Sequence, residues 1–379
     1  MAATLNIDDL RRSARRFLPR GMFEYIDRGT EDETALARLR QSFDRCELMP
    51  RVLIDTGDRS LDAPLFGRRR PLPFVIAPTA AAGLVRFGGE VLLARAAAAA
   101  GIPFCVSTQS ITAIEEIAAS GAELWFQLYV WRDRDLTHAL LDRVAGCGAE
   151  TLLLTVDTAV SPKREYNQRN GFGVPVTPSL RGALDVALHP VWAWTVLLRC
   201  LRTGGWPAYA HYPAEFRGRI TESVAHDRVR LCDRLSWSDV ADLRQRWRGR
   251  IIVKGVLSPD DARRAAEAGV DAIVVSNHGG RNLDSAPSPL AVLPRIADAV
   301  GDRLTLLADS GVRRGSDAAK LLAAGAEAVL LGRAPLFGLA SDGQQGAERA
   351  LAILGDELDR TMALLGCRTV ADLRGCRIA

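Results

Sequence analysis

The chain has 379 residues, of which 48% are hydrophobic and 25% are charged, and its formal net charge is only +4. These values are ordinary for a globular protein and argue against a nucleic-acid partner. Seven cysteines without a CxxC pair indicate reduced thiols in a cytoplasmic protein, rather than a disulfide framework or a metal site. The first residues lack the apolar core of a signal peptide, and no apolar run reaches the roughly 20 residues that span a bilayer.

Residues 5–45 are predicted to be helical, with Asn6 or Asp8 as a cap, and to pack as an N-terminal extension. Residues 56–71 are rich in turn formers and predict a hairpin that covers the base of the barrel formed by the strands that follow. Eight short apolar runs come next. They lie at 73–78, 102–107, 124–129, 151–157, 250–256, 272–278, 304–310 and 328–333.

Continuous apolar runs of about six residues are typical of strands buried on both faces of a parallel sheet. Most of the runs are separated by stretches with helical patterns, at 88–100, 113–120, 134–147, 236–247, 258–268, 290–300 and 315–324. Eight such units predict an α/β fold, the (β/α)₈ TIM barrel, and we treat residues 1–379 as a single domain. The fourth and fifth strands are separated by an insertion, roughly 158–233, on the side where barrels hold their active sites.

The ends of the last strands predict a phosphate site. Asp309 to Gly315 follow the seventh strand, and Gly332 and Arg333 follow the eighth. Barrels commonly bind phosphate with these two loops, where glycines let backbone N–H groups approach and arginines supply charge.

The central strand ends predict a proton-transfer group beside an anion clamp. His278 ends the sixth strand and Asp157 ends the fourth, where the carboxylate could orient the imidazole. Arg164 and Arg281 fit a carboxylate substrate, because a guanidinium binds a carboxylate bidentately. Lys254 ends the fifth strand and could form a Schiff base or balance an anionic cofactor; its position alone does not decide between them.

These residues together resemble the FMN-dependent L-2-hydroxy acid dehydrogenase/oxidase family. The resemblance runs from about Leu18 to Cys367, and its most specific element is the run SNHGGRNLD at 276–284, in which Asn282 replaces the commoner glutamine. Further matching runs are LP at 18–19, APT at 77–79, WFQLY at 125–129, TVD at 155–157, VKG at 253–255, DSGVRRG at 309–315 and LGR at 331–333.

The resemblance implies a role for each matching residue. His278 would be the base and Asp157 its partner, while Tyr25, Tyr129, Arg164 and Arg281 would bind the substrate. Lys254 would stabilise negative charge on the flavin, which favours the balance of an anionic cofactor over a Schiff base. The remaining residues implied to bind FMN are Ala77, Pro78, Thr79, Ala80, Ser107, Gln127, Thr155, Ser276, Asp309, Gly311, Arg313, Gly332 and Arg333.

The insertion is unusually apolar for an active-site loop. Within residues 179–212, tryptophans and aliphatic residues are flanked by Arg181, Arg199 and Arg202, a composition typical of an interfacial membrane segment. We therefore predict that residues 176–216 bind a membrane, at the inner face of the cell membrane. The resemblance to the membrane-associated mandelate dehydrogenase branch supports this prediction and implies a quinone as electron acceptor, and the family suggests a homotetramer.

Other readings stay open. Ala80 stands where mandelate dehydrogenases tend to have glycine and oxidases alanine, so an oxygen-using oxidase that produces hydrogen peroxide is an alternative. An FMN-containing isomerase or a non-catalytic barrel would not need the histidine with both arginines. Thr108, Ser161 and Ala80 are small, which predicts aryl or longer-chain 2-hydroxy acids, mandelate ahead of lactate.

Overall fold

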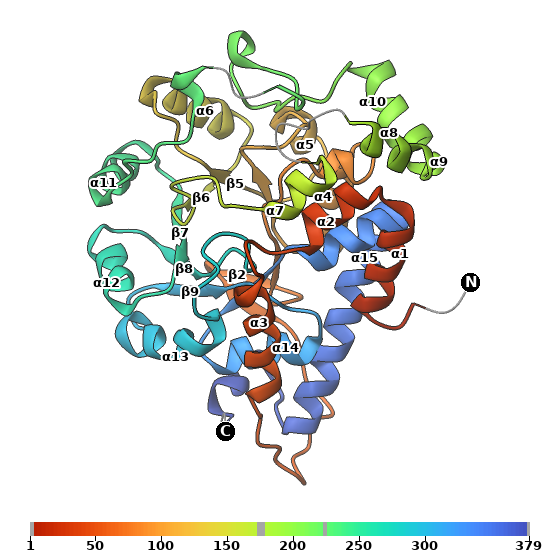
Figure 1. Ribbon diagram of the computed structural model, residues 1–379. Coiled ribbons are helices and arrows are strands. Elements are labelled where there is room, and N and C mark those ends of the chain that lie inside the picture. Colours follow the sequence, from red (N-terminus) through yellow and green to blue (C-terminus); the bar gives the residue numbers. More distant parts are fainter. Residues whose placement is uncertain (1–3, 173–178, 223–225, 377–379) are drawn as a thin grey trace.

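The computed structural model describes residues 4–172, 179–222 and 226–376, and it has the (β/α)₈ barrel that the sequence predicts (Figure 1). Eight parallel strands close in the order β10-β3-β4-β5-β6-β7-β8-β9. Their bounds are β3 Phe74–Ile76, β4 Phe104–Ser107, β5 Leu124–Leu128, β6 Thr151–Thr155, β7 Arg250–Val256, β8 Ala272–Val275, β9 Thr305–Ala308 and β10 Ala328–Leu331. Each lies within one of the eight apolar runs.

The strands are buried on both faces, which explains why they are continuously apolar. Inward-facing side chains such as Val75, Trp125 and Ile252 form one core inside the barrel, and a larger core lies between the strands and the helices. The predicted hairpin is present as β1 (Ala63–Leu65) and β2 (Arg68–Arg70). Phe66 at its turn packs against Trp125, with ring centroids 5.8 Å apart, so the hairpin closes the base of the barrel.

The predicted helices surround the barrel. They are α4 (Gly89–Ala99), α5 (Ile114–Ala118), α6 (Arg134–Gly146), α11 (Trp237–Arg246), α12 (Pro259–Glu267), α13 (Pro289–Val300) and α14 (Gly315–Ala323). Ser258 caps α12 as expected, since its side chain accepts a hydrogen bond from the backbone N–H of Asp260. The glycines after several of these helices provide the positive φ that ends them.

The N-terminal extension comprises α1 (Ile7–Phe17), α2 (Arg20–Asp27) and α3 (Thr34–Arg45), and Asn6, rather than Asp8, caps α1. Helix α15 (Arg333–Leu365), which is interrupted at Asp342 and Gly343, was not predicted from the sequence. Helix α15 packs against α1, α4 and α14, so it joins the extension to the barrel (Figure 1). As a result, α2 lies at the open end of the barrel, where the C-terminal ends of the strands are.

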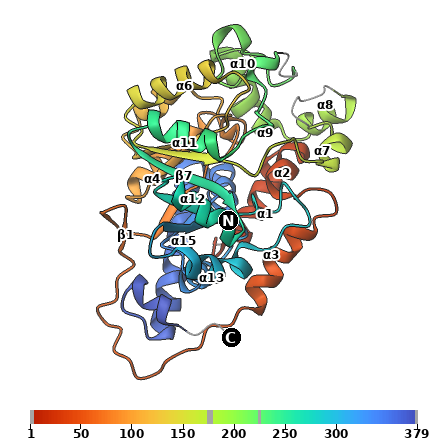
Figure 2. The same cartoon turned by 90° about the vertical axis from the view of Figure 1, so that its left-hand side faces the viewer.

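The insertion after β6 folds into short helices along one side of the open end (Figure 2). They include α7 (Glu165–Asn170), α8 (Leu180–Ala187), α9 (Pro190–Trp192), the π-helical turn η2 (Ala193–Leu197), α10 (Leu198–Thr203), and the single turns η3 (Ala214–Phe216) and η4 (Asp227–Val229). Of the described helices, none is individually long and apolar enough to cross a membrane. The stretches 180–187 and 190–203, which meet at an angle of 91°, reach that length and apolar composition only when they are taken together. Residues 176–178 of the predicted membrane segment lie outside the described residues.

Candidate active site

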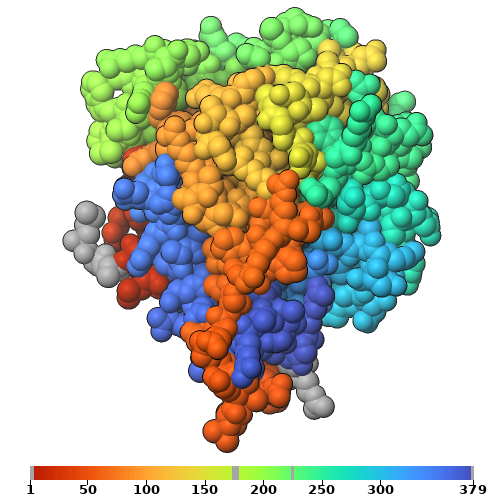
Figure 3. Space-filling model, turned by 180° about the vertical axis from the view of Figure 1, so that it is seen from behind, coloured from red at the N-terminus to blue at the C-terminus, as the bar shows by residue number. Residues whose placement is uncertain are grey.

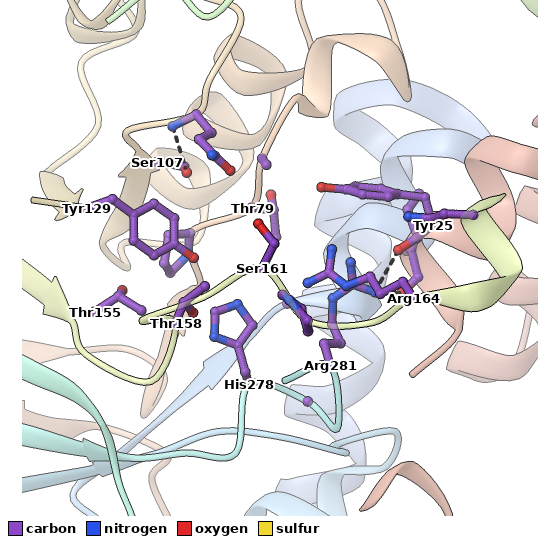
Figure 4. Close-up of a pocket in the computed structure, with 18 of the residues that line it drawn as sticks. Tyr25, Thr79, Ser107, Tyr129, Thr155, Thr158, Ser161, Arg164, His278 and Arg281 are labelled. Atoms are coloured by element: carbon purple, nitrogen blue, oxygen red, sulfur yellow. Dashed lines mark hydrogen bonds between the residues drawn. The ribbon is translucent and has the colours of Figure 1, made fainter. Parts of the chain in front are cut away.

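A cavity of about 1270 Å³ opens at the C-terminal ends of the barrel strands. It brings together residues from strand ends, from α2 and from the insertion (Figure 4). Eighteen of the twenty predicted site residues line it: Tyr25, Ala77, Pro78, Thr79, Ala80, Ser107, Gln127, Tyr129, Thr155, Arg164, Lys254, His278, Arg281, Asp309, Gly311, Arg313, Gly332 and Arg333. The other two, Asp157 and Ser276, each hydrogen-bond to a lining residue.

His278 and Asp157 form the central pair of the site. The imidazole Nδ1 lies 2.9 Å from Asp157 Oδ1, and since a carboxylate can only accept, Nδ1 donates the proton of this bond. Nε2 is therefore the nitrogen left for the cavity. Burial raises the pKa of Asp157, but the attraction and hydrogen bond of His278, with those of Lys254 and Thr158, together outweigh it and lower the pKa to about 2. Burial lowers the pKa of His278 despite the opposing attraction of Asp157, which keeps the imidazole a neutral base near neutral pH.

The loop that begins at His278 is held in an unusual backbone conformation. His278 has a φ of 57°, and Gly279 and Gly280 follow with φ values of 67° and 70°. A non-glycine residue with positive φ is costly and is commonly found at functional sites. A Cβ on Gly280 would lie 2.7 Å from the backbone nitrogen of Leu36, so glycine is required where this loop meets α3.

The rest of the matching run positions its neighbours. Asn282 Nδ2 donates to the carbonyl oxygen of Asp157 and to the hydroxyl of Thr158, both at 2.8 Å. Asp284 accepts the backbone N–H of Ala35 at 2.9 Å and thereby ties the loop to the start of α3. The asparagine that departs from the commoner glutamine is thus long enough to hold the backbone at Asp157.

Lys254 is buried between two partners. Its ammonium lies 2.9 Å from Asp309 Oδ2 and donates to Ser276 Oγ at 2.7 Å. Burial alone would lower the pKa of Lys254, but Asp309 and Asp157 outweigh it and the net pKa is raised. A charged lysine cannot act as the amine nucleophile that a Schiff base requires, so this geometry favours charge balance.

Partly buried guanidinium groups gather on the other side of the cavity. Arg333 donates to the carbonyl oxygens of Ile26 and Arg28 at 2.8 and 3.2 Å, and Arg281 donates to those of Tyr25 and Arg28 at 2.6 and 3.0 Å. Burial and the neighbouring arginines lower the pKa of Arg333 to about 9. Carbonyl oxygens supply no counter-charge, so the site favours an anion at this position.

The residues present fit FMN. The two arginines of the phosphate loops, Arg313 and Arg333, are both partly buried beside the cavity, and the pKa of each is lowered chiefly by burial. At the opposite side, Ser107 donates to Gln127 Oε1 at 3.1 Å, while Gln127 Nε2 is buried without a partner. Arg313 has Asp27 within 3.7 Å, whereas Arg333 contacts carbonyl oxygens alone, so positive charge is left for a ligand. An unpaired buried donor at one end and this excess of positive charge at the other match a flat polar ring joined to a phosphate.

The structure adds residues that the sequence analysis missed. Tyr209 and Tyr212 come from the insertion, line the cavity and stack with ring centroids 5.4 Å apart. Only their aromatic character within the run AYAHY could have suggested them. Thr108, in contrast, is buried with its hydroxyl bonded to the carbonyl oxygen of Gln127 at 2.6 Å, and it does not line the cavity. The space for a substrate side chain therefore depends on Ala80 and Ser161, which do.

Comparisons with known proteins agree with this site. The model of the FMN-dependent dehydrogenase family matches residues 14–378. The L-lactate dehydrogenase of Caulobacter vibrioides is 42% identical over 369 residues, covering 96% of this chain and 95% of that protein. The (S)-mandelate dehydrogenase of Pseudomonas putida is 38% identical, covering 97% and 92%. A solved structure described as the monotopic membrane protein (S)-mandelate dehydrogenase superposes with a TM-score of 0.92 at 37% identity, covering 99% of each chain. The chain therefore belongs to the FMN-dependent dehydrogenase family and is an oxidoreductase that acts on 2-hydroxy acids with FMN as its cofactor.

Proposed function

We propose that this enzyme oxidises (S)-2-hydroxy acids to 2-oxo acids with His278 as the base. The observation that carries the proposal is the 2.9 Å contact between His278 Nδ1 and Asp157 Oδ1, which leaves Nε2 to accept a proton from the substrate. The positive charge that then develops on the ring is stabilised by the ionised carboxylate. Tyr129, also in the cavity, would hydrogen-bond the substrate hydroxyl or carboxylate.

Two arginines would bind the substrate carboxylate. The guanidinium groups of Arg164 and Arg281 lie 5.8 and 5.2 Å from the centre of the Tyr25 ring. Arg164 Nε is buried without a hydrogen-bond partner, so a donor is available there (Figure 4). A bidentate carboxylate would satisfy it and would orient the substrate carbon toward His278.

The cofactor would lie across the strand ends. When bound, FMN supplies the acceptor for the two electrons that leave the substrate. Arg313, Arg333 and the backbone at Gly311 and Gly332 would hold its phosphate. Residues 77–80, with Ser107, Gln127 and Thr155, would contact its ring, and Lys254, held by Asp309 and Ser276, would balance negative charge there.

The enzyme would prefer substrates with large side chains. Ala80 and Ser161 both line the cavity and leave room that bulkier residues would fill. We therefore place mandelate ahead of lactate. Anaerobic mixing of the purified holoenzyme with (S)-mandelate, L-lactate or glycolate, followed by flavin absorbance, tests both parts. Fast bleaching by mandelate supports the proposal, faster bleaching by glycolate contradicts the substrate assignment, and no bleaching by any of them contradicts the reaction.

We also propose that the insertion binds the inner face of the cell membrane and that the electron acceptor is a quinone. Leu180, Leu184, Leu188, Val191 and Trp194 are all exposed, between 62% and 91%. On the opposite side of the same segment, Val196 is buried and Trp192 donates from Nε1 to the carbonyl oxygen of Leu84 at 2.8 Å. One face therefore anchors the segment to the barrel, and the other is free to enter lipid.

The insertion also reaches the substrate site, which favours an acceptor dissolved in the membrane. Arg181 lines the cavity, and Asp185 accepts the backbone N–H of Gly21 in α2, the helix that carries Tyr25. A relative described as a monotopic membrane protein supports the same reading. The homotetramer remains a proposal that rests on the family alone, and sedimentation of the detergent-solubilised enzyme measures it.

Vesicles containing anionic lipid and a quinone test the membrane proposal. The variant Leu184→Ser/Trp194→Ser should lose vesicle binding while still being reduced by substrate, because neither residue lines the cavity. Val52→Ser is the matched control, since Val52 is 79% exposed but lies outside both the apolar segment and the cavity. Vesicle binding by the double variant at the wild-type level would contradict the membrane assignment, and faster reoxidation by oxygen than by quinone would make the enzyme an oxidase.

A further inference from the structure

Two cysteines outside the active-site cavity lie against each other, just after the end of α15. Cys367 Sγ is 3.5 Å from Cys376 Sγ, which is the single contact between cysteine sulfurs in the described ranges. Cys367 follows Gly366 at the end of α15, and Cys376 follows the turn η5 (Val370–Gly375). Cys367 is buried, whereas Cys376 is partly exposed. Neither lines the active-site cavity.

The backbone around Cys367 holds a long connecting segment in place. The side chain of Arg368 donates to the carbonyl oxygen of Asp55 at 2.6 Å, and the carbonyl oxygen of Arg368 accepts the N–H of Ser60 at 2.8 Å. Gly366 packs so closely that a Cβ there would lie 3.1 Å from the carbonyl oxygen of Arg51. The segment 51–60 and the C-terminal turn therefore lie side by side at the base of the molecule (Figures 2 and 3).

We propose that Cys367 and Cys376 are a reversible redox site that forms a disulfide. The oxidant is a peroxide, and the steps balance. The thiol of Cys376 loses its proton and attacks hydrogen peroxide, the O–O bond breaks, and the leaving hydroxide takes up that proton, so a sulfenic acid and one water result. The thiol of Cys367 then loses its proton and attacks that sulfur, the S–O bond breaks, and the leaving hydroxide takes up the proton as a second water, so two thiols are oxidised and one peroxide is reduced to two waters.

The geometry assigns the order of these steps. Cys376 is the accessible sulfur, so it meets the oxidant first. Cys367 is buried and its sulfur lies 3.5 Å from that of Cys376, so it is placed to meet the oxidised sulfur and not the oxidant in solution. The sulfurs must approach to about 2.05 Å. Cys376 follows the single turn η5, whereas Cys367 is held by the long helix before it, so Cys376 is the sulfur that would move.

The disulfide would hold the base of the molecule together when the peroxide concentration rises, and it would be reduced again when free thiols are in excess. It would close a small ring around η5, which is held otherwise by the buried side chains of Val370 and Leu373. Because Arg368 lies inside this ring, its two hydrogen bonds to the segment 51–60 would be retained in the oxidised state. Reduced cytoplasmic thiols can reopen a bond of this accessible kind.

Mass spectrometry of the holoenzyme tests the proposal. Treatment with hydrogen peroxide should lower the intact mass by about 2 Da, the loss of two hydrogens, and should remove two of the seven titratable thiols. Tryptic digestion without reductant should yield the peptides that carry Cys367 and Cys376 joined together. Dithiothreitol should restore the mass and both thiols, and the rate of substrate oxidation should not change.

Variants separate this site from general oxidation. Cys376→Ser and Cys367→Ser should each abolish the loss of 2 Da, while Cys147→Ser, which changes another partly exposed cysteine, should retain it. The two single variants keep the test valid if one of them folds poorly. Peroxide that adds oxygen to Cys376 without joining it to Cys367, or a disulfide to any other cysteine, would overturn the proposal.

Discussion

Replacing Asp157 with asparagine separates the charge of this carboxylate from the hydrogen bond that it makes to His278. The amide oxygen of asparagine can still accept the Nδ1 proton at the observed 2.9 Å, so the imidazole keeps its tautomer and orientation. The attraction between a carboxylate and a protonated imidazole is lost. Any change in rate then reports how much that attraction stabilises the protonated base.

The pKa of Asp157 provides the magnitude. Burial raises this pKa, but His278, together with Lys254 and Thr158, lowers it from 3.8 to about 2, and His278 is the first of the lowering causes. A change of this size corresponds to roughly 2.5 kcal/mol, at about 1.36 kcal/mol per pKa unit. The part of this change that comes from His278 is reciprocal, so the protonated imidazole loses up to a similar amount in the variant. We expect the rate of flavin reduction to fall by as much as about 60-fold.

The pH dependence follows with a definite sign. Burial places the pKa of His278 below its usual 6.5, so the wild-type rate should be constant above this pKa and should fall as the pH decreases through it. In Asp157→Asn the attraction that partly offsets burial is gone. The pKa decreases further, and the acid limb should move to lower pH while the plateau rate is reduced.

Anaerobic stopped-flow measurement of flavin bleaching by (S)-mandelate, between about pH 5 and 8, gives both quantities. Asp142→Asn is the control, since Asp142 is exposed and pairs with Arg246 at 2.6 Å on the outside of the barrel. It should behave as the wild type. A rate for Asp157→Asn within threefold of the wild type, with an acid limb that has not moved, would refute the reasoning.

Three further variants test other parts of the site. Arg281→Lys should raise KM for the 2-hydroxy acid by about 10-fold or more in steady-state assays, because the bidentate contact is lost; an unchanged KM would exclude a role in carboxylate binding. Lys254→Met leaves the buried carboxylate of Asp309 without its 2.9 Å partner and should destabilise the apoprotein by about 3–5 kcal/mol in denaturant unfolding, whereas equal stability would mean that the pair is not coupled. Gly279→Ala would place a Cβ 2.9 Å from Arg333 Nη1 at a φ of 67°, so FMN affinity measured by flavin fluorescence should fall by about 10-fold or more; unchanged affinity would remove Arg333 from the phosphate site.

The barrel could be predicted because its signal is local. Strands buried on both faces must be apolar throughout, so 74–76 and 151–155 stand out without any knowledge of their partners. Helix α15 was missed for the opposite reason. Its stretch contains glycines and the break at Asp342 and Gly343, and its stability comes from packing against α1 and α4, which no sequence window contains.

The sequence by itself determined which residues could do the chemistry, because strand ends converge in a barrel whatever the loops do. It determined the pairing of His278 with Asp157 as a hypothesis, from two residues 121 positions apart. Tertiary structure decided what surrounds them. Tyr209 and Tyr212 enter the cavity and Thr108 does not, because the path of a long insertion and the rotation of a buried side chain depend on contacts between segments distant in sequence. Tertiary structure also decided the pairing of Cys367 with Cys376, since their spacing in the sequence carries no metal or disulfide motif and their contact depends on how η5 turns back onto the end of α15.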